Sequence, residues 1–207
     1  MKNSIQKSNE VRLTNAGKRQ AYASRILFAV MALTMTFALF GCLEEDGLGG
    51  KSAKKAAVKY RISTGIETAI TFDNTKELFR TDTWISGLHY IGITDPKNQV
   101  SHTYLSTTGW TTQAYTPGGV SSGDYAFNEA DAGNVEKLPD RTIAGKKCKA
   151  YRYTHKNGTE FITATWNGII MYNEDVKTGV TMEATSATLD FPASAFSKES
   201  IEVTWLQ

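Results

Sequence analysis

The stretch that decides the fold is residues 146–172, KKCKAYRYTHKNGTEFITATWNGIIMY. Two Asn-Gly pairs, Asn157-Gly158 and Asn167-Gly168, separate runs that are rich in Thr, Tyr, Ile, Phe and Trp, residues that favour strands. Asn and Gly both tolerate the positive φ angles that tight primed hairpin turns require. The pattern therefore predicts an antiparallel three-strand meander over residues 146–155, 159–166 and 169–172.

Similar short runs recur on both sides of this meander, and several alternate apolar with polar residues. The expected strands are 58–62, 68–72, 77–84, 88–94, 100–106 and 110–115 before the meander, and 180–191 and 200–206 after it. Pro192 predicts one helical turn over 192–196. Residues 122–137 are the only stretch long enough for a helix, and Gly133 weakens it. A mostly β protein follows, built as one curved antiparallel sheet, a barrel or a sandwich.

The N-terminal part of the chain has a different character. Residues 26–40, ILFAVMALTMTFALF, are apolar apart from two threonines, and Gly41-Cys42 follows directly. Six basic residues and one acid, Glu10, precede this run. A basic lead, a short apolar stretch and a small residue indicate a secretory signal peptide. As a helix the stretch spans roughly 22 Å, short of the roughly 30 Å hydrocarbon core, which argues against a permanent transmembrane anchor.

Residues 39–42, Leu-Phe-Gly-Cys, resemble the lipobox of bacterial lipoproteins. The resemblance implies that the Cys42 thiol receives a diacylglycerol, that the leader is cut before Cys42, and that the new amine receives a further acyl chain such as palmitate. Each buried methylene contributes about 0.8 kcal/mol, so two or three chains anchor stably where one does not. Leu43, in place of an Asp, implies the outer membrane. The alternative is an ordinary secretory leader without lipid.

Three segments are therefore expected: a signal peptide over 1–41, a lipidated flexible tether over 42–57, and a β domain over 58–207. The tether is acidic, then Gly-rich, then Lys-rich, a composition that buries no core. Its acids at 44–46 resemble an export tag that carries lipoproteins to the cell surface, or they only solubilise the linker. Without the leader, the net charge falls from +2 to about −3, and no basic patch indicates nucleic-acid binding.

The motifs of enzyme chemistry are weak in this chain. Residues 119–123, GVSSG, match the letters of a nucleophile elbow, with Asp140 and His155 following in the permitted order. That motif requires alternating strands and helices, which the pattern lacks. His89 and His102 lack metal-ligand spacing, and Cys148 fits a small buried residue in a strand. We therefore expect no enzyme, no metal and no cofactor.

Residues 142–151, TIAGKKCKAY, resemble a segment of the lipoprotein-carrier family of exported bacterial proteins, which includes the periplasmic chaperone and the outer-membrane receptor for lipoproteins. In that family an I-x-G turn enters a central strand and the next strand carries a Trp, as Trp166 does here. The resemblance implies a single curved antiparallel sheet, an open half-barrel with one or two short helices on its concave side. Members with known roles hold acyl chains there.

The tryptophans are the candidate ligand-binding residues. Trp166 shares one strand face with Ile162 and Ala164, the more apolar of the two faces, and we expect it on the concave side, with Trp84 and Trp110 as further candidates. More often such residues close a core, where they bury a large area. Two functions remain open: a lipid-anchored envelope protein that holds an apolar, acyl-chain or lipid-like ligand, or a non-enzymatic subunit of an envelope assembly with no small ligand.

Overall fold

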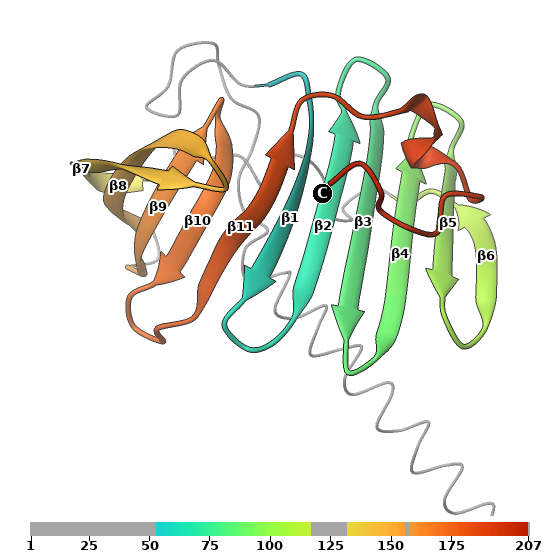
Figure 1. Cartoon of the computed structure of the whole chain (residues 1–207), viewed down its shortest axis with the longest axis horizontal. Coiled ribbons are helices and arrows are strands. Elements are labelled where there is room, and N and C mark those ends of the chain that lie inside the picture. The colour runs from blue at the N-terminus through green and yellow to red at the C-terminus, as the bar shows by residue number, and fades with distance from the viewer. Residues whose placement is uncertain (1–52, 117–131, 156–157, 207) are drawn as a thin grey trace, which may run out of the picture. The chain divides into compact units, whose positions relative to one another are not determined.

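The computed structural model describes residues 53–116, 132–155 and 158–206. The expected leader, Cys42, most of the tether and residues 119–123 lie outside the described residues. Figure 1 shows the described residues as one large sheet with almost no helix. Within these ranges no helix has the length and apolar character needed to cross a bilayer.

The strands are β1 (Lys55–Ile62), β2 (Glu67–Asp73), β3 (Leu78–Ile85), β4 (Leu88–Asp95), β5 (Val100–Leu105), β6 (Gly109–Ala114), β7 (Ala132–Ile143), β8 (Lys146–His155), β9 (Glu160–Trp166), β10 (Ile169–Asp175) and β11 (Thr181–Thr188). They form one sheet in the order β6-β5-β4-β3-β2-β1-β11-β10-β9-β8-β7, and every neighbouring pair is antiparallel. The sheet is open, because β6 and β7 end the order. This confirms the single antiparallel sheet and excludes the sandwich.

The first and last strands meet in the middle of the sheet, where β1 pairs with both β2 and β11. Ala56, Ala57, Val58 and Tyr60 of β1 are all fully buried, so both faces of this strand are covered. β1 begins at Lys55, three residues before the expected start of the domain at 58. The small side chains of Ala56 and Ala57 explain the difference, because they looked like part of a polar tether.

The predicted meander is confirmed as β8, β9 and β10. Asn167 and Gly168 have φ angles of 50° and 73°, as a primed two-residue turn between Trp166 and Ile169 requires. At the other turn the His155 N–H donates to the Thr159 carbonyl, so residues 155 and 159 pair across it as the predicted strand bounds require, and Gly158 has a φ of 83°. Residues 156 and 157 lie outside the described residues.

The C-terminal segment, residues 189–206, contains the expected helical turn, η3 (Ala193–Phe196), but the strand expected over 200–206 is absent. Val203, Trp205 and Leu206 of this stretch pack on the sheet instead of pairing with a strand. Leu206 is buried against Ala57 and Ala69, and Trp205 Nε1 donates to Thr71 Oγ1 at 3.1 Å. The helix considered over 122–137 is also wrong where it is described, because residues 132–137 belong to β7.

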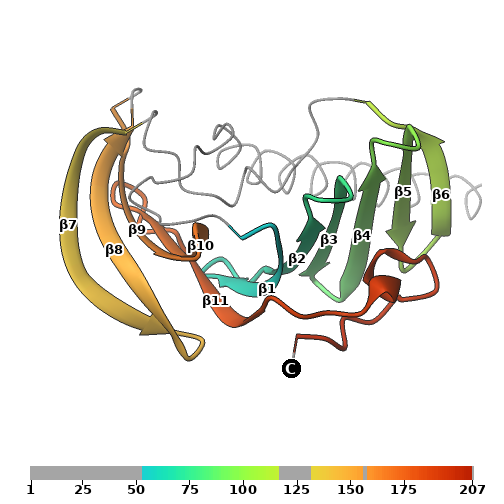
Figure 2. The ribbon, with the colours of Figure 1, turned by 90° about the horizontal axis from the view of Figure 1, so that it is seen from above.

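Two faces of the sheet are distinguished below, because residues paired across neighbouring strands lie on the same face. Lys59, Ala69, Asp82, Ile91 and Tyr104 are paired in series from β1 to β5, on the face that carries the C-terminal segment. We call this the C-terminal face and the other the opposite face. Figure 2 shows β2 to β6 bending away from the C-terminal segment.

Candidate functional site

Two of the three predicted tryptophans belong to an aromatic row on the C-terminal face. Trp84 of β3 stacks on His89 of β4 with ring centroids 4.7 Å apart. His89 meets Tyr104 of β5 edge-on at 6.2 Å, and Tyr104 lies 5.2 Å from Trp110 of β6. The structure thus brings Trp84 and Trp110 into one row across four strands. Trp84 and His89 are direct register partners, as are Tyr104 and Trp110, whereas His89 lies diagonally from Tyr104, which pairs with Ile91.

A lysine lies over the ring of two of the candidate tryptophans, Trp84 and Trp166. Lys59 Nζ lies 5.2 Å from the Trp84 ring centroid and 3.0 Å from Glu67 Oε2. The hydrogen bond from Lys59 holds the pKa of the Glu67 carboxyl below its usual value, and Arg61 adds to the effect. Trp166 lies apart from this row, on β9, where Lys146 Nζ is 4.9 Å from its ring. The strand pairing places Trp166 on the C-terminal face as well. Ala164, two residues before Trp166, pairs with Tyr172, which pairs with Glu183, which in turn pairs with Arg61. Arg61 lies two residues from Lys59 and therefore on the C-terminal face.

A buried chain of charged side chains, the Arg80 chain, lies on the same face as this aromatic row. Arg80 is 0% exposed and Asp82 1%, and Arg80 donates from Nε and Nη2 to the two Asp82 oxygens at 2.6 and 2.8 Å. His89 Nε2 lies 3.0 Å from Asp82 Oδ1. Arg80 Nη1 also donates to the carbonyls of Ala195 and Ser200, at 2.9 and 2.6 Å. The chain therefore holds the C-terminal segment against the sheet, which is a positioning role.

On the opposite face, one line of directly paired residues crosses β1, β11, β10, β9 and β8. We call it the Asn173 row, and its members are Ile62, Met182, Asn173, Thr163 and Tyr151. All five are buried, with exposures of 0–6%. Asn173 thus lies in the middle of a deeply buried line that combines the apolar Ile62 and Met182 with the polar Thr163 and with Tyr151. Thr165 lies two residues beyond Thr163 on the same face.

Two polar atoms at this place have no hydrogen-bond partner within the described part of the chain: Thr165 Oγ1 and Asn173 Oδ1. Their residues are only 2% and 3% exposed. The neighbouring hydroxyl of Thr163, by contrast, donates to the Tyr172 carbonyl at 3.1 Å. An unpartnered buried polar group costs about 1–3 kcal/mol, and native proteins rarely leave one without a water, ion or ligand. The pair can accept hydrogen bonds, and the threonine can also donate one.

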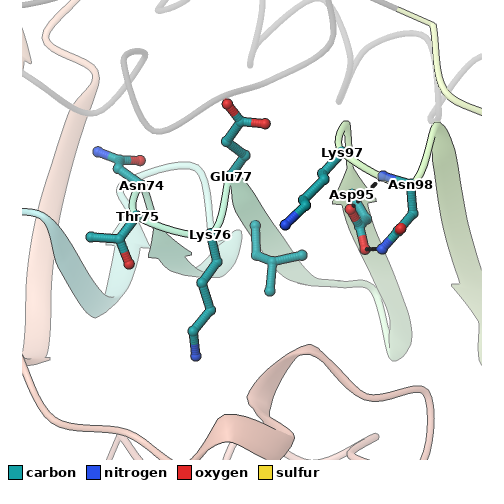
Figure 3. A pocket seen from close by; sticks show the side chains of 8 residues that line it. Asn74, Thr75, Lys76, Glu77, Asp95, Lys97 and Asn98 are labelled. Atoms are coloured by element: carbon teal, nitrogen blue, oxygen red, sulfur yellow. Dashed lines mark hydrogen bonds between the residues drawn. The ribbon is translucent and has the colours of Figure 1, made fainter.

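A polar depression of about 560 Å³ lies at one end of the sheet, between the turn at 74–77 and the loop at 95–98 (Figure 3). Lys76, Glu77, Asp95 and Lys97 line it, so positive and negative groups balance. Lys76 is 61% exposed and 3.6 Å from Asp73 Oδ2, and Asp95 already binds Asn98. Seven of the eight lining residues are polar or charged and one is Leu78, whereas sites for hydrocarbon ligands are lined mainly by apolar side chains.

The other residues considered for chemistry do not converge. Among the described residues, no group of three His, Cys, Asp or Glu side chains is placed to hold a metal ion. His102 Nδ1 lies 2.8 Å from Thr112 Oγ1, and Asp140 is 3.7 Å from Lys147. Cys148 is 0% exposed, as predicted, and burial raises the pKa of its thiol. It is therefore protonated and unreactive at neutral pH.

Neither Asn173 nor the Arg80 chain was identified from the sequence. One signal for Asn173 was available: it directly follows the apolar run Ile169–Tyr172, where a buried polar residue stands out. Arg80 and Asp82 are likewise two positions apart in a strand, which places both on one face. What the sequence does not contain is the identity of their partners.

No family model matches the chain, and no curated protein matches it. Among solved structures, an uncharacterized conserved protein from Thermus thermophilus is 6% identical with a TM-score of 0.44, over 69% of this chain and 83% of that one. A domain from Vibrio parahaemolyticus assigned to outer membrane lipoprotein sorting is 9% identical with a TM-score of 0.30, over 76% and 93%. A DUF1329 family protein from Desulfovibrio piger is 10% identical with a TM-score of 0.27, over 74% and 90%. Similarities at this level assign neither a family nor a ligand.

Proposed function

We propose that this chain is a non-enzymatic envelope protein, anchored to the outer membrane through lipid on Cys42, that binds a lipid-like amphiphile against the Asn173 row. Because these side chains are already buried, binding requires the groups that cover them to move aside. The hydrocarbon part then contacts the apolar members of the row, Ile62 and Met182, and the polar part bonds to Asn173 and Thr165. The observation that carries the proposal is the pair of buried, unpartnered polar atoms on the face that also buries Ile62 and Met182. Burial of hydrocarbon supplies affinity, and the two polar atoms supply orientation.

The test separates a ligand site from a packing defect. The variant Thr165→Val keeps the shape of the side chain but removes the unpartnered hydroxyl. A ligand site predicts that the free protein becomes more stable, by about 1 kcal/mol, because an uncompensated buried group has gone. It also predicts weaker binding of a fatty acid or lysophospholipid, measured by isothermal titration calorimetry on protein made without residues 1–42. Lipids extracted from the purified protein and identified by mass spectrometry name the natural ligand.

The matched control is Thr163→Val, which removes a hydroxyl that already has a partner. It is expected to lower the free energy of unfolding by about 1 kcal/mol and to leave ligand affinity nearly unchanged. Trp166→Ala tests the competing prediction that the tryptophans line the ligand site. If Trp166→Ala weakens binding while Thr165→Val does not, the ligand lies on the C-terminal face. If no amphiphile binds, the proposed ligand site is wrong, and the alternative function as a subunit of an envelope assembly without a small ligand is favoured.

A further inference from the structure

The two edges of the open sheet differ in a way that points to a partner. β7, at one edge, contains Pro139, two register irregularities and four charged side chains over 136–141. Each of these features discourages the addition of another strand. β6, at the other edge, has the sequence GWTTQA, which contains no charge and no proline. Its register with β5 is unbroken from Gly109 to Ala114. Only one edge is thus protected.

The unprotected edge also presents free backbone groups in a regular array. Tyr115 N–H donates to the Gln99 carbonyl at 2.9 Å, on the side of β5. Backbone groups along an antiparallel strand alternate between its two sides, so Trp110, Thr112 and Ala114 direct their N–H and C=O groups away from β5. Thr111 to Ala114 are exposed, so this edge is open to solvent.

We propose that β6 pairs antiparallel with β6 of a second copy of this chain, with Thr112 opposite Thr112 across a two-fold axis. This register is favoured because only here do all three outward residues find a backbone partner. Trp110 pairs with the partner's Ala114, and Ala114 pairs with the partner's Trp110, so that about six hydrogen bonds form. Shifting the axis by one residue, to Thr111, leaves Ala114 unpaired. The proposal does not depend on ligand binding at the Asn173 row.

The side chains of the edge fit a second copy better than another partner. In this register the half-buried Trp110 of one copy meets the small Ala114 of the other, and a large residue opposite a small one packs without a clash. No like charges meet across the axis, because residues 109–114 carry none. The charged and bulged β7 does not offer the same match, so addition stops at two copies. One strand pair buries little area, and the association is correspondingly weak.

Disulfide trapping in the full-length, membrane-anchored protein detects such a weak pair. In a hydrogen-bonded antiparallel pair the two Cα atoms lie about 5.5 Å apart, within the range of a disulfide. Thr112→Cys is therefore expected to give a covalent dimer on mild oxidation. The matched control is Thr111→Cys, whose side chain lies on the opposite face and meets the partner's Gln113. It is expected to give at least tenfold less covalent dimer than Thr112→Cys. Oxidation of the parent chain measures how much covalent dimer forms through Cys148 alone.

A second variant addresses the backbone directly. Thr112→Pro removes an N–H that faces away from β5, so the chain keeps its own pairing while the dimer loses its central hydrogen bonds. Thr112→Pro also removes the exposed hydroxyl that lies 2.8 Å from His102 Nδ1, so we expect it to unfold slightly below the parent temperature and to be monomeric by sedimentation in detergent. A dimer that survives Thr112→Pro, equal trapping at 111 and 112, or no trapping at either position would each overturn the proposal.

Discussion

At the scale of single residues, Arg80 shows how much of this structure depends on one side chain. It is fully buried, it neutralises Asp82, and it joins β3 to carbonyls 115 and 120 residues away in the chain. The sequence indicates that Arg80 and Asp82 share a strand face, but it does not indicate that Ala195 and Ser200 lie above them. The formation of a buried ion pair depends on such distant contacts, which residue spacing does not contain.

Replacing Arg80 with Met is expected to lower the free energy of unfolding by about 3–5 kcal/mol, because Asp82 is left buried without its partner. Urea denaturation followed by tryptophan fluorescence measures the loss. The double variant Arg80→Met/Asp82→Leu is the control, and it should recover a large part of the stability since no charge remains buried. A loss below about 1 kcal/mol in the single variant would show that water reaches Asp82.

At the scale of elements, the strands before and after the Asn-Gly pairs were predictable because alternation and turn residues are local signals. The turn at Asn167-Gly168 follows from the two residues themselves. The segment 200–206 was mistaken for a strand because Ile201, Val203 and Trp205 alternate with polar residues. In the structure Trp205 and its neighbour Leu206 pack on β1 and β2, and this contact depends on the whole sheet.

The turn between β9 and β10 carries the prediction at this scale. Gly168 has a φ of 73°, where a β-branched residue meets its own backbone. Gly168→Val is therefore expected to lower the free energy of unfolding by at least about 1 kcal/mol. Gly168→Asn is the matched control and should cost less, because Asn tolerates this conformation. Equal melting temperatures for the two variants, measured by circular dichroism, would rule out backbone strain as the cause.

At the scale of the whole molecule, the candidate site was the least predictable part. Alternation correctly separates Phe161, Thr163 and Thr165 from Ile162, Ala164 and Trp166 on β9, and the pairing confirms two faces. It does not say which face is the more deeply covered. Hydrophobicity favoured the set with Trp166, whereas the buried row with Asn173 and Thr163 lies on the other face. Coverage of a face depends on segments distant in the sequence, so the pattern of one strand cannot fix it.

The membrane anchor carries the prediction for the whole chain. If lipid on Cys42 is the sole anchor, Cys42→Ser prevents acylation and removes the two or three acyl chains that hold the protein to the bilayer. Membrane fractionation and intact mass spectrometry should then show the chain outside the membrane fraction and without the acyl mass. Cys148→Ser is the control, and it should remain anchored and acylated, because the Cys148 thiol is buried in β8. A Cys42→Ser chain that stays in the membrane after its leader has been removed would contradict the lipoprotein assignment. Anchoring would then have to come from the folded sheet itself.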